Sequence, residues 1–254
     1  MEIQLSQPYE DLTFMTPLSE GRANTLVNFL AASSPSRVVD IGCGWAELLL
    51  RVVACTPSCM ATGVDVNEVS IAHGRQLAQQ RGLTERVNLL CADGRDHMTL
   101  DHDAVICIGA SQVWGRPVED NQPLDYTAAL TAIREILPRA GRLIYGEVIW
   151  SRPPTPQALN QLSGRADELV TTADLADLAV AAGFAPVSIH EASLGEWDAF
   201  ESGYNARYAS WLASHEYDHP DAVEVRERAS RQRDKYLRGY RDVMGMAYLQ
   251  LVAV

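Results

Sequence analysis

The chain has 254 residues, a formal net charge of −12 and 47% hydrophobic side chains. This length fits one α/β domain with an added element, or two small domains, and it is sufficient for a sizeable core. The negative charge disfavours nucleic acid and anionic membranes as partners, because their phosphate groups would be repelled. No apolar run could span a membrane, no signal peptide is visible, and the five cysteines form no CxxC pairs, so we expect a cytoplasmic monomer or homodimer.

Strands and helices are expected to alternate through the first part of the chain. A polar N-terminal stretch continues into a helix that opens at Pro17 and Ser19. Strands are then expected at 38–41, 60–66, 87–91, 103–108 and 143–150, separated by helices at 45–54, 69–81 and 124–137. Such alternation predicts a doubly wound, mostly parallel sheet, in which the carboxyl ends of the strands share the edge that binds ligands.

Beyond residue 150 the expected elements are a proline-rich loop (152–156), a helix (172–182), a strand (187–190), two helices (196–216 and 221–242) and a strand (246–254). Thr172 is the expected N-cap of the first of these helices. The whole order predicts an N-terminal helical segment (1–36), an α/β core (37–195), a helical insertion or cap (196–242) and a final strand of the core sheet (243–254).

The strongest motif is RVVDIGCGWAELLL, in which a strand carrying Asp40 ends in the turn Gly42-Cys43-Gly44 and a helix follows. Glycines in such a turn let the backbone approach a ligand closely. A dinucleotide site needs a third glycine, but this sequence has Glu47 there. An acid at this position would repel a pyrophosphate and would suit a cationic ligand.

Three further motifs lie at successive strand ends. Asp65 in GVDVNE could accept hydrogen bonds from two ribose hydroxyls, or it could only cap the next helix. Asp93 in CADGRD could accept a hydrogen bond from an adenine amino group, or it could only form a turn. In ICIGASQVWG, Gly109 leaves room beside a cofactor, and the side chains expected to face a substrate are Ser111, Gln112 and Trp114.

Together these motifs resemble the class I S-adenosylmethionine-dependent methyltransferases. The resemblance is carried by VDIGCG, GVD, CADGRD and LPRAGRLIYGE, in that order, and covers roughly residues 20–190. It implies a seven-stranded Rossmann-like sheet, S-adenosyl-L-methionine as cofactor and methyl transfer to a small molecule. In that family the glycine turn holds the methionine part, the second-strand acid the ribose and the acid after the third strand the adenine. The cofactor-binding residues implied by position are Asp40, Gly42, Cys43, Gly44, Asp65, Val66, Ala92, Asp93, Gly94 and Gly109.

The end of the fifth expected strand carries the candidate catalytic group. The sulfonium methyl group is reactive, so the protein mainly has to align an attacking atom with it. A general base helps only when that atom starts protonated, and Glu147 is the candidate, with a structural role as the alternative. Tyr145 is expected on the opposite face of the strand.

Aromatic residues of the segment 196–216 fall on one helical stripe. Such a stripe forms either core or the inner wall of a substrate cap, and Trp197 and Tyr204 are the candidate substrate contacts within it. His215 and His219 have helical spacing for a metal pair but no third ligand, so no metal site is expected.

Three other functions are alternatives. RNA methylation is disfavoured by the negative charge and because no Asn-Pro-Pro-Tyr-like motif follows the fourth strand. An NAD-dependent oxidoreductase is disfavoured by the missing third glycine and by the absence of a Tyr-x-x-x-Lys pair. A non-catalytic protein that binds the cofactor would share every motif above, and only turnover distinguishes it from an enzyme.

Overall fold

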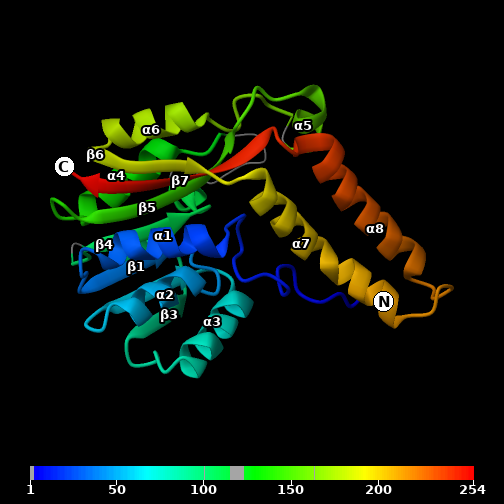
Figure 1. The fold of residues 1–254 in the computed structure, drawn as a ribbon, viewed down its shortest axis with the longest axis horizontal. Helices are drawn as coiled ribbons and strands as arrows, with labels where there is room; N and C mark the ends of the chain where they lie inside the picture. Colours follow the sequence, from blue (N-terminus) through cyan, green and yellow to red (C-terminus); the bar gives the residue numbers. More distant parts are fainter. Residues whose placement is uncertain (1–2, 100, 115–122, 163) are drawn as a thin grey trace.

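The computed structural model describes residues 3–99, 101–114, 123–162 and 164–254. Seven strands form one sheet in the order β3-β2-β1-β4-β5-β7-β6 (Figure 1). They are β1 (Arg37–Ile41), β2 (Met60–Asp65), β3 (Val87–Cys91), β4 (Ala104–Ile108), β5 (Arg142–Trp150), β6 (Phe184–Glu191) and β7 (Met244–Ala253). Only β7 runs antiparallel to its neighbours, β5 and β6. The expected doubly wound, mostly parallel sheet is confirmed.

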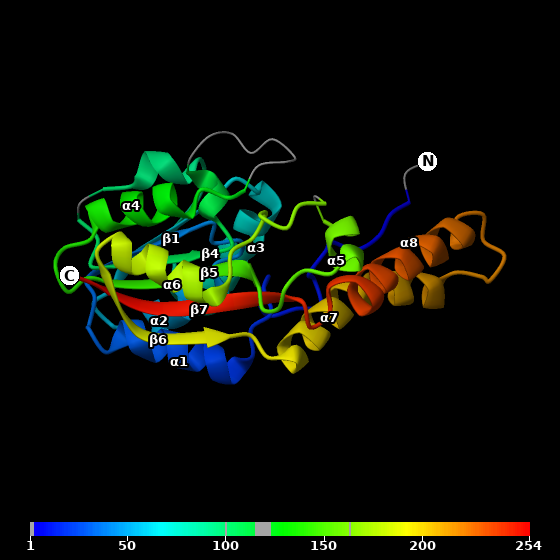
Figure 2. The same ribbon diagram turned by 90° about the horizontal axis from the view of Figure 1, so that it is seen from above.

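Helices cover both faces of this sheet (Figure 2). One face, which we call the α1 face, carries α1 (Glu20–Ala31), α2 (Glu47–Cys55) and α3 (Glu68–Gln80), whose buried residues belong to one core cluster. The other, the α4 face, carries α4 (Tyr126–Ile136) and α6 (Thr172–Ala181). Successive side chains of a strand point to opposite faces, so each strand contributes to both halves of the core. In β5, for example, Ile144 packs on the α1 face and Tyr145 on the α4 face.

Two helix starts differ from the expected ones. The N-cap of α6 is Thr171 rather than Thr172, because Thr171 and Asp174 form a reciprocal capping box. The proline-rich stretch is a loop only as far as Thr155, which caps the short helix α5 (Pro156–Asn160). Proline fits the first position of a helix, where its missing N–H has no intrahelical partner. Short 3₁₀ turns at Gly94–His97 and Ser111–Val113 were also not expected.

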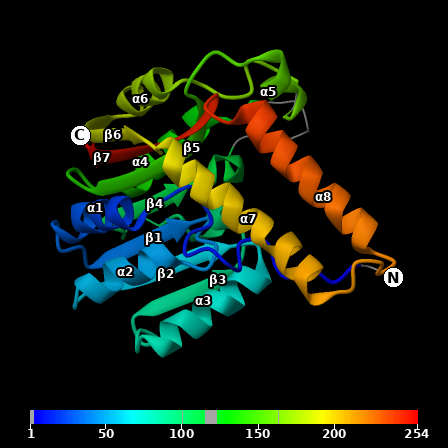
Figure 3. The same cartoon turned by 45° about the vertical axis from the view of Figure 1, so that its right-hand side comes forward.

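The helices α7 (Leu194–Ser214) and α8 (Ala222–Asp234) project as an antiparallel pair beyond the carboxyl edge of the parallel strands (Figure 3). A π-type turn follows α8, which is therefore shorter than the helix expected at 221–242. Residues 3–18, which we call the N-terminal strap, run from beside α7 across this edge to α1. Within the described part of the chain, no helix combines the length and the apolar character needed to cross a membrane.

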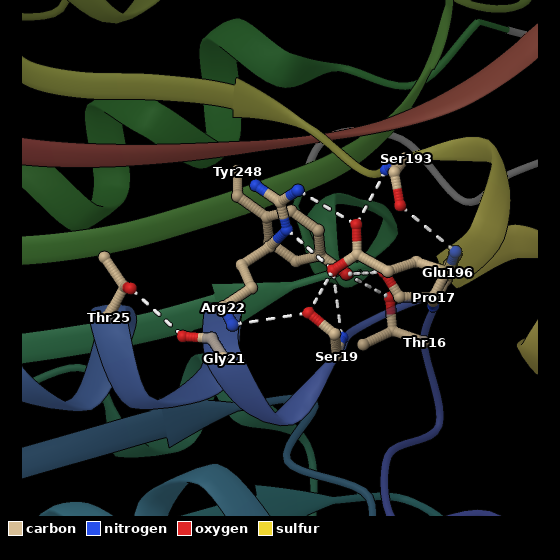
Figure 4. A network of polar contacts seen from close by, with 9 residues as sticks. All are labelled: Thr16, Pro17, Ser19, Gly21, Arg22, Thr25, Ser193, Glu196 and Tyr248. Atoms are coloured by element: carbon tan, nitrogen blue, oxygen red, sulfur yellow. Dashed lines mark hydrogen bonds and ion pairs between the residues drawn. The ribbon is translucent and has the colours of Figure 1, made fainter.

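The carboxylate of Glu196 joins the strap, α1 and α7 (Figure 4). It accepts hydrogen bonds from Ser19 N (3.0 Å) and Oγ (2.7 Å), and from Ser193 N (2.7 Å). The Arg22 guanidinium adds two more, each 2.9 Å long. Burial disfavours the charged form of Glu196, but the bonds from Arg22, Ser19 and the two backbone amides outweigh it, so its pKa lies well below the usual value.

We expect Glu196→Gln to lower the free energy of unfolding by about 1.5–3 kcal/mol near neutral pH, because hydrogen bonds to a charged acceptor are lost. A depressed pKa stabilises the fold above the ordinary glutamate value of 4.5, and this contribution is lost as the pH falls. Denaturant unfolding should therefore show the difference from wild type shrinking below that pH. Glu224→Gln, which removes an exposed pair with Arg228, should change stability little. A Glu196→Gln protein as stable as wild type at pH 7 would contradict this role.

Candidate active site

The turn after β1 depends on left-handed backbone at Gly42, Gly44 and Ala46, with φ of 70°, 54° and 63°. A Cβ on Gly42 would lie 2.5 Å from the Cβ of Ala110, at the end of β4. Only glycine tolerates both the conformation and this close approach. The Gly42 amide donates to the carbonyl of Val64 (2.8 Å), which ties the turn to β2 as well.

Asp65, at the end of β2, closes the same turn. Its Oδ2 accepts a hydrogen bond from Gly44 N and its Oδ1 accepts one from Asn67 N, each 2.8 Å long. The helix α3 is capped by Asn67, whose Oδ1 accepts from the amides of Val69 and Ser70. Asp65 is therefore not the N-cap of α3. Each of its oxygens keeps acceptor capacity for a further donor.

A cavity of about 320 Å³ lies on the α1 face at the carboxyl edge of the strands. Its first side is formed by the glycine turn and the residues around it, Asp40, Gly42, Cys43, Gly44, Trp45, Glu47, Leu48 and Asp65. Its second side is formed by the ends of β4, β5 and β7, with Ile106, Ile108, Gly109, Val148 and Met246. The strap, through residues 14–18, and the start of α7, through Trp197 and Phe200, complete the enclosure. The volume lies within the usual range for ligand sites, about 300–1,000 Å³.

The ionisable side chains that line the cavity, among the described residues, are carboxylates and the Cys43 thiol. Of the carboxylates, Glu47 is paired with Arg51 and Arg81, at 2.7 Å each. Asp40 is only 4% exposed, and no described residue donates a hydrogen bond to its carboxyl group. Burial, together with the charge of Asp65, raises the pKa of Asp40 well above its usual value. An unpartnered acid of this kind favours a cationic ligand over a pyrophosphate.

The residues expected around an adenine ring lie outside this cavity. The Asp93 carboxylate binds the guanidinium and the amide of Arg95, which lowers the pKa of Asp93 to about 2. Asp93 thereby caps the short turn Gly94–His97, and a role in forming a turn was the alternative to adenine binding. Gly94 is needed for packing, since a Cβ there would lie 2.7 Å from Ile41. Val66 is 77% exposed at the edge of the site, so its contact with a base remains a prediction, as does that of Ala92 and Asp93.

The placement of Glu147 corrects the expectation that it contacts substrate. Its neighbour Val148 faces the cavity, so Glu147 points to the α4 face, where it is 1% exposed. Its Oε1 accepts a hydrogen bond from Ser111 N (2.8 Å), and burial raises its pKa. Tyr145 hydrogen-bonds to the Ser111 hydroxyl and lies on the same face as Glu147, so the expectation of opposite faces was wrong. Residues two apart in a strand share a face.

The residues after β4 turn away from the cavity in the same way. Ser111 is fully buried, and Trp114 packs in the core of the α4 face. Gln112 is exposed, and its Nε2 donates to the carbonyl of Gly109 (3.2 Å). The short 3₁₀ turn that follows Ala110 directs these side chains away, which corrects the expectation that Ser111, Gln112 and Trp114 face a substrate. Gly109 does line the cavity.

The aromatic stripe of α7 has two roles. Trp197 and Phe200 line the cavity. Tyr204 does not, because its ring packs against Tyr9 of the strap, 5.2 Å away between centroids. The remainder of the stripe packs against α8 through Tyr208 and Trp211. The strap residues 14–18 are cavity residues that sequence patterns did not indicate.

We expect Asp40→Asn to raise the melting temperature near neutral pH. The raised pKa means that the folded state holds this proton more tightly than the unfolded chain does. Ionising Asp40 therefore costs stability as the pH rises above the ordinary aspartate value of 3.8, and an asparagine avoids that cost. The gain over wild type should disappear on acidification. Asp96→Asn, at an exposed site, is the control, and a variant that is less stable than wild type at every pH would rule the idea out.

Residues 38–138 match the family model described as a methyltransferase domain. The chain superposes on an S-adenosylmethionine-dependent methyltransferase from Geobacter sulfurreducens, solved with S-adenosyl-L-homocysteine, with a TM-score of 0.81, 20% identity and coverage of 97% of this chain and 96% of that one. An S-adenosylmethionine-dependent methyltransferase from Thiobacillus denitrificans, also solved with S-adenosyl-L-homocysteine, superposes with a TM-score of 0.80 and 21% identity, over 97% of this chain and 96% of that one.

The uncharacterized protein YjhP of Escherichia coli is 23% identical over 240 residues, which cover 93% of this chain and 92% of that protein. Its crystal structure superposes with a TM-score of 0.77 over 95% of each chain, at 22% identity. The segment that matches the domain model carries the glycine turn, Asp65 and Asp93, and it includes most of the parallel part of the sheet, from β1 to β4. Residues 38–138 therefore match a methyltransferase domain, and the whole chain shares the fold of these solved S-adenosylmethionine-dependent methyltransferases.

Proposed function

We propose that the protein transfers the methyl group of S-adenosylmethionine to a small molecule that binds in the cavity beside the glycine turn. The observation that carries this proposal is the unpartnered, buried Asp40 in a cavity whose described lining holds no cationic side chain. A pyrophosphate would be repelled there, whereas the ammonium and sulfonium groups of this cofactor would be attracted. The NAD-dependent alternative is correspondingly disfavoured.

The residues fit the cofactor in two parts. The methionine part would lie on the glycine turn, near Asp40, where the lack of side chains on Gly42 and Gly44 leaves the backbone accessible. The ribose would lie at Asp65, whose oxygens are already oriented by the amides of Gly44 and Asn67. The cofactor supplies an electrophilic methyl group. The chain's own residues then orient the acceptor and exclude water.

A small-molecule acceptor in the cytoplasm is the setting that we propose for this reaction. The enclosure of the cavity by the strap and α7 supports a small acceptor, and the net charge of −12 argues against nucleic acid. All five cysteines are free thiols, which is typical of a reducing compartment.

Calorimetry tests the cofactor directly. We expect S-adenosylhomocysteine and S-adenosylmethionine to release or absorb heat on binding and to raise the melting temperature, whereas NAD should do neither. Asp40→Asn should weaken this binding even though it stabilises the free protein, because the attraction for the ammonium is lost. If neither sulfur compound binds at saturating concentration, the proposed function is wrong.

Asp65→Ala tests the ribose position. Losing a charged acceptor costs about 1.5–3 kcal/mol, so the affinity for S-adenosylhomocysteine should fall roughly ten- to a hundredfold. The fold should persist, because Asp65 lies at a strand end outside the apolar core. Glu68→Ala, which removes a neighbouring exposed acid paired with Arg75, should leave the affinity within about twofold of wild type. Unchanged affinity in Asp65→Ala would mean that the ribose binds elsewhere.

A further inference from the structure

The two sides of the cavity differ in chemistry. The carboxylates of its lining lie on the β1–β2 side, with the glycine turn. Toward β4, β5 and β7 the lining is apolar, formed by Ile108, Val148 and Met246, and Trp197 and Phe200 of α7 add aromatic rings to the enclosure. Val148 and Met246 lie directly opposite each other in the β5–β7 pair, so they present one continuous apolar surface. A methyl acceptor that is in line with the cofactor sulfur would lie against this second side.

No described residue of the second side could take a proton from an acceptor. Glu147 and Tyr145, the ionisable groups of β5 nearest to it, point to the opposite face of the sheet. Thr16, from the strap, is hydrogen-bonded to Tyr248 OH, which in turn donates to the carbonyl of Pro17. An acceptor that must lose a proton in order to react would find no partner for that proton here.

An anionic acceptor is also disfavoured by this lining. The described residues that line the cavity supply carboxylates and aromatic rings but no cationic side chain that could stabilise a phenolate, thiolate or carboxylate, and Arg51, which lies behind Glu47 and Phe14, is already paired with Glu47 and Glu20. The aromatic rings of Trp197 and Phe200 instead favour positive charge, and so do the carboxylates Asp40 and Asp65. The cavity is thus suited to positive charge at both of its sides.

We infer, on the basis of the proposed function, that the methyl acceptor is a small neutral tertiary amine or a thioether, which becomes a quaternary ammonium or a sulfonium product. The acceptor's lone pair forms the new bond to the methyl carbon, and the methyl–sulfur bond breaks with its electron pair remaining on the cofactor sulfur. No proton is transferred. One positive charge moves from the first side of the cavity to the second, and both sides stabilise it.

Binding to the protein saturated with S-adenosylhomocysteine tests this inference without requiring turnover. Three probes of similar size are compared: choline, its neutral carbon isostere 3,3-dimethylbutanol, and the anion 3,3-dimethylbutanoate, in which a carboxylate replaces the alcohol group of the isostere. We expect choline to bind about five- to thirtyfold more tightly than the alcohol, as cation–π and charge attraction predict, and the carboxylate to bind most weakly. If the alcohol or the carboxylate binds as tightly as choline, the inference is overturned while the cofactor site stands.

Variants of the aromatic residues Phe200 and Trp197 test where in the cavity the preference for choline arises. Phe200→Leu keeps an apolar side chain but removes the ring, so it should reduce the preference for choline over its isostere when both are measured with S-adenosylhomocysteine at saturation. Ile108→Leu, on the same side of the cavity, is the matched control and should keep the preference. An unchanged preference in both Phe200→Leu and Trp197→Leu would show that the aromatic wall is not where the cation binds.

Turnover distinguishes the two kinds of acceptor. With S-adenosylmethionine, we expect transfer to N,N-dimethylethanolamine or to 2-(methylthio)ethanol to exceed transfer to phenol. The rate with the amine should rise with pH, because the protonated amine loses its proton and frees its lone pair. The rate with the thioether should not change over the same pH interval, because a thioether carries no such proton. Faster methylation of phenol than of either neutral donor would refute the inference. Failure of S-adenosylhomocysteine to bind at all would instead refute the proposed function on which it rests.

Discussion

The turn that follows β1 is the constraint on which the rest of the site depends. Its positive φ angles allow the chain to reverse within a few residues, so that one short segment touches β2, β4 and the strap at once. Gly42 packs against Ala110 and Gly44 donates to Asp65. The indole of Trp45 donates to the carbonyl of Thr13 (2.9 Å), which holds the strap over the cavity. A side chain added at either glycine would disturb all of these contacts together.

The burial of Asp40 in the site lowers the stability of the free protein. Asp40 is buried beside the charge of Asp65 and has no described donor, so its ionised form is disfavoured in the free protein. Two other buried acids have cationic partners: Glu196 accepts five hydrogen bonds, two of them from Arg22, and Glu47 is paired with two arginines. The contrast within one chain is itself an indication that Asp40 is matched by a ligand rather than by the protein.

Sequence patterns predicted the sheet and the side of the cavity formed by the glycine turn and Asp65, because these depend on local spacing. Gly42 and Asp65 follow apolar strands directly, and a parallel sheet brings strand ends together. The orientation of Trp114 could not be predicted in this way, since it depends on a short turn held by Glu147, which is 36 residues from its partner Ser111. The strap has no hydrophobic period and lies over the cavity through tertiary contacts such as that between Tyr9 and Tyr204.

The position of β7 has a consequence for how the chain can fold as it is made. The strand β6 lies at the edge of the sheet and is hydrogen-bonded there to β7, which separates it from β5. The whole α7–α8 pair is translated between the two strands. During synthesis, β1 to β5 can therefore pair one after another. The strand β6, in contrast, is made before β7, which is its neighbour in the sheet. Until Met244–Ala253 has been synthesised, β5 and β6 both present unpaired backbone groups, and such open strand edges favour aggregation of the nascent chain.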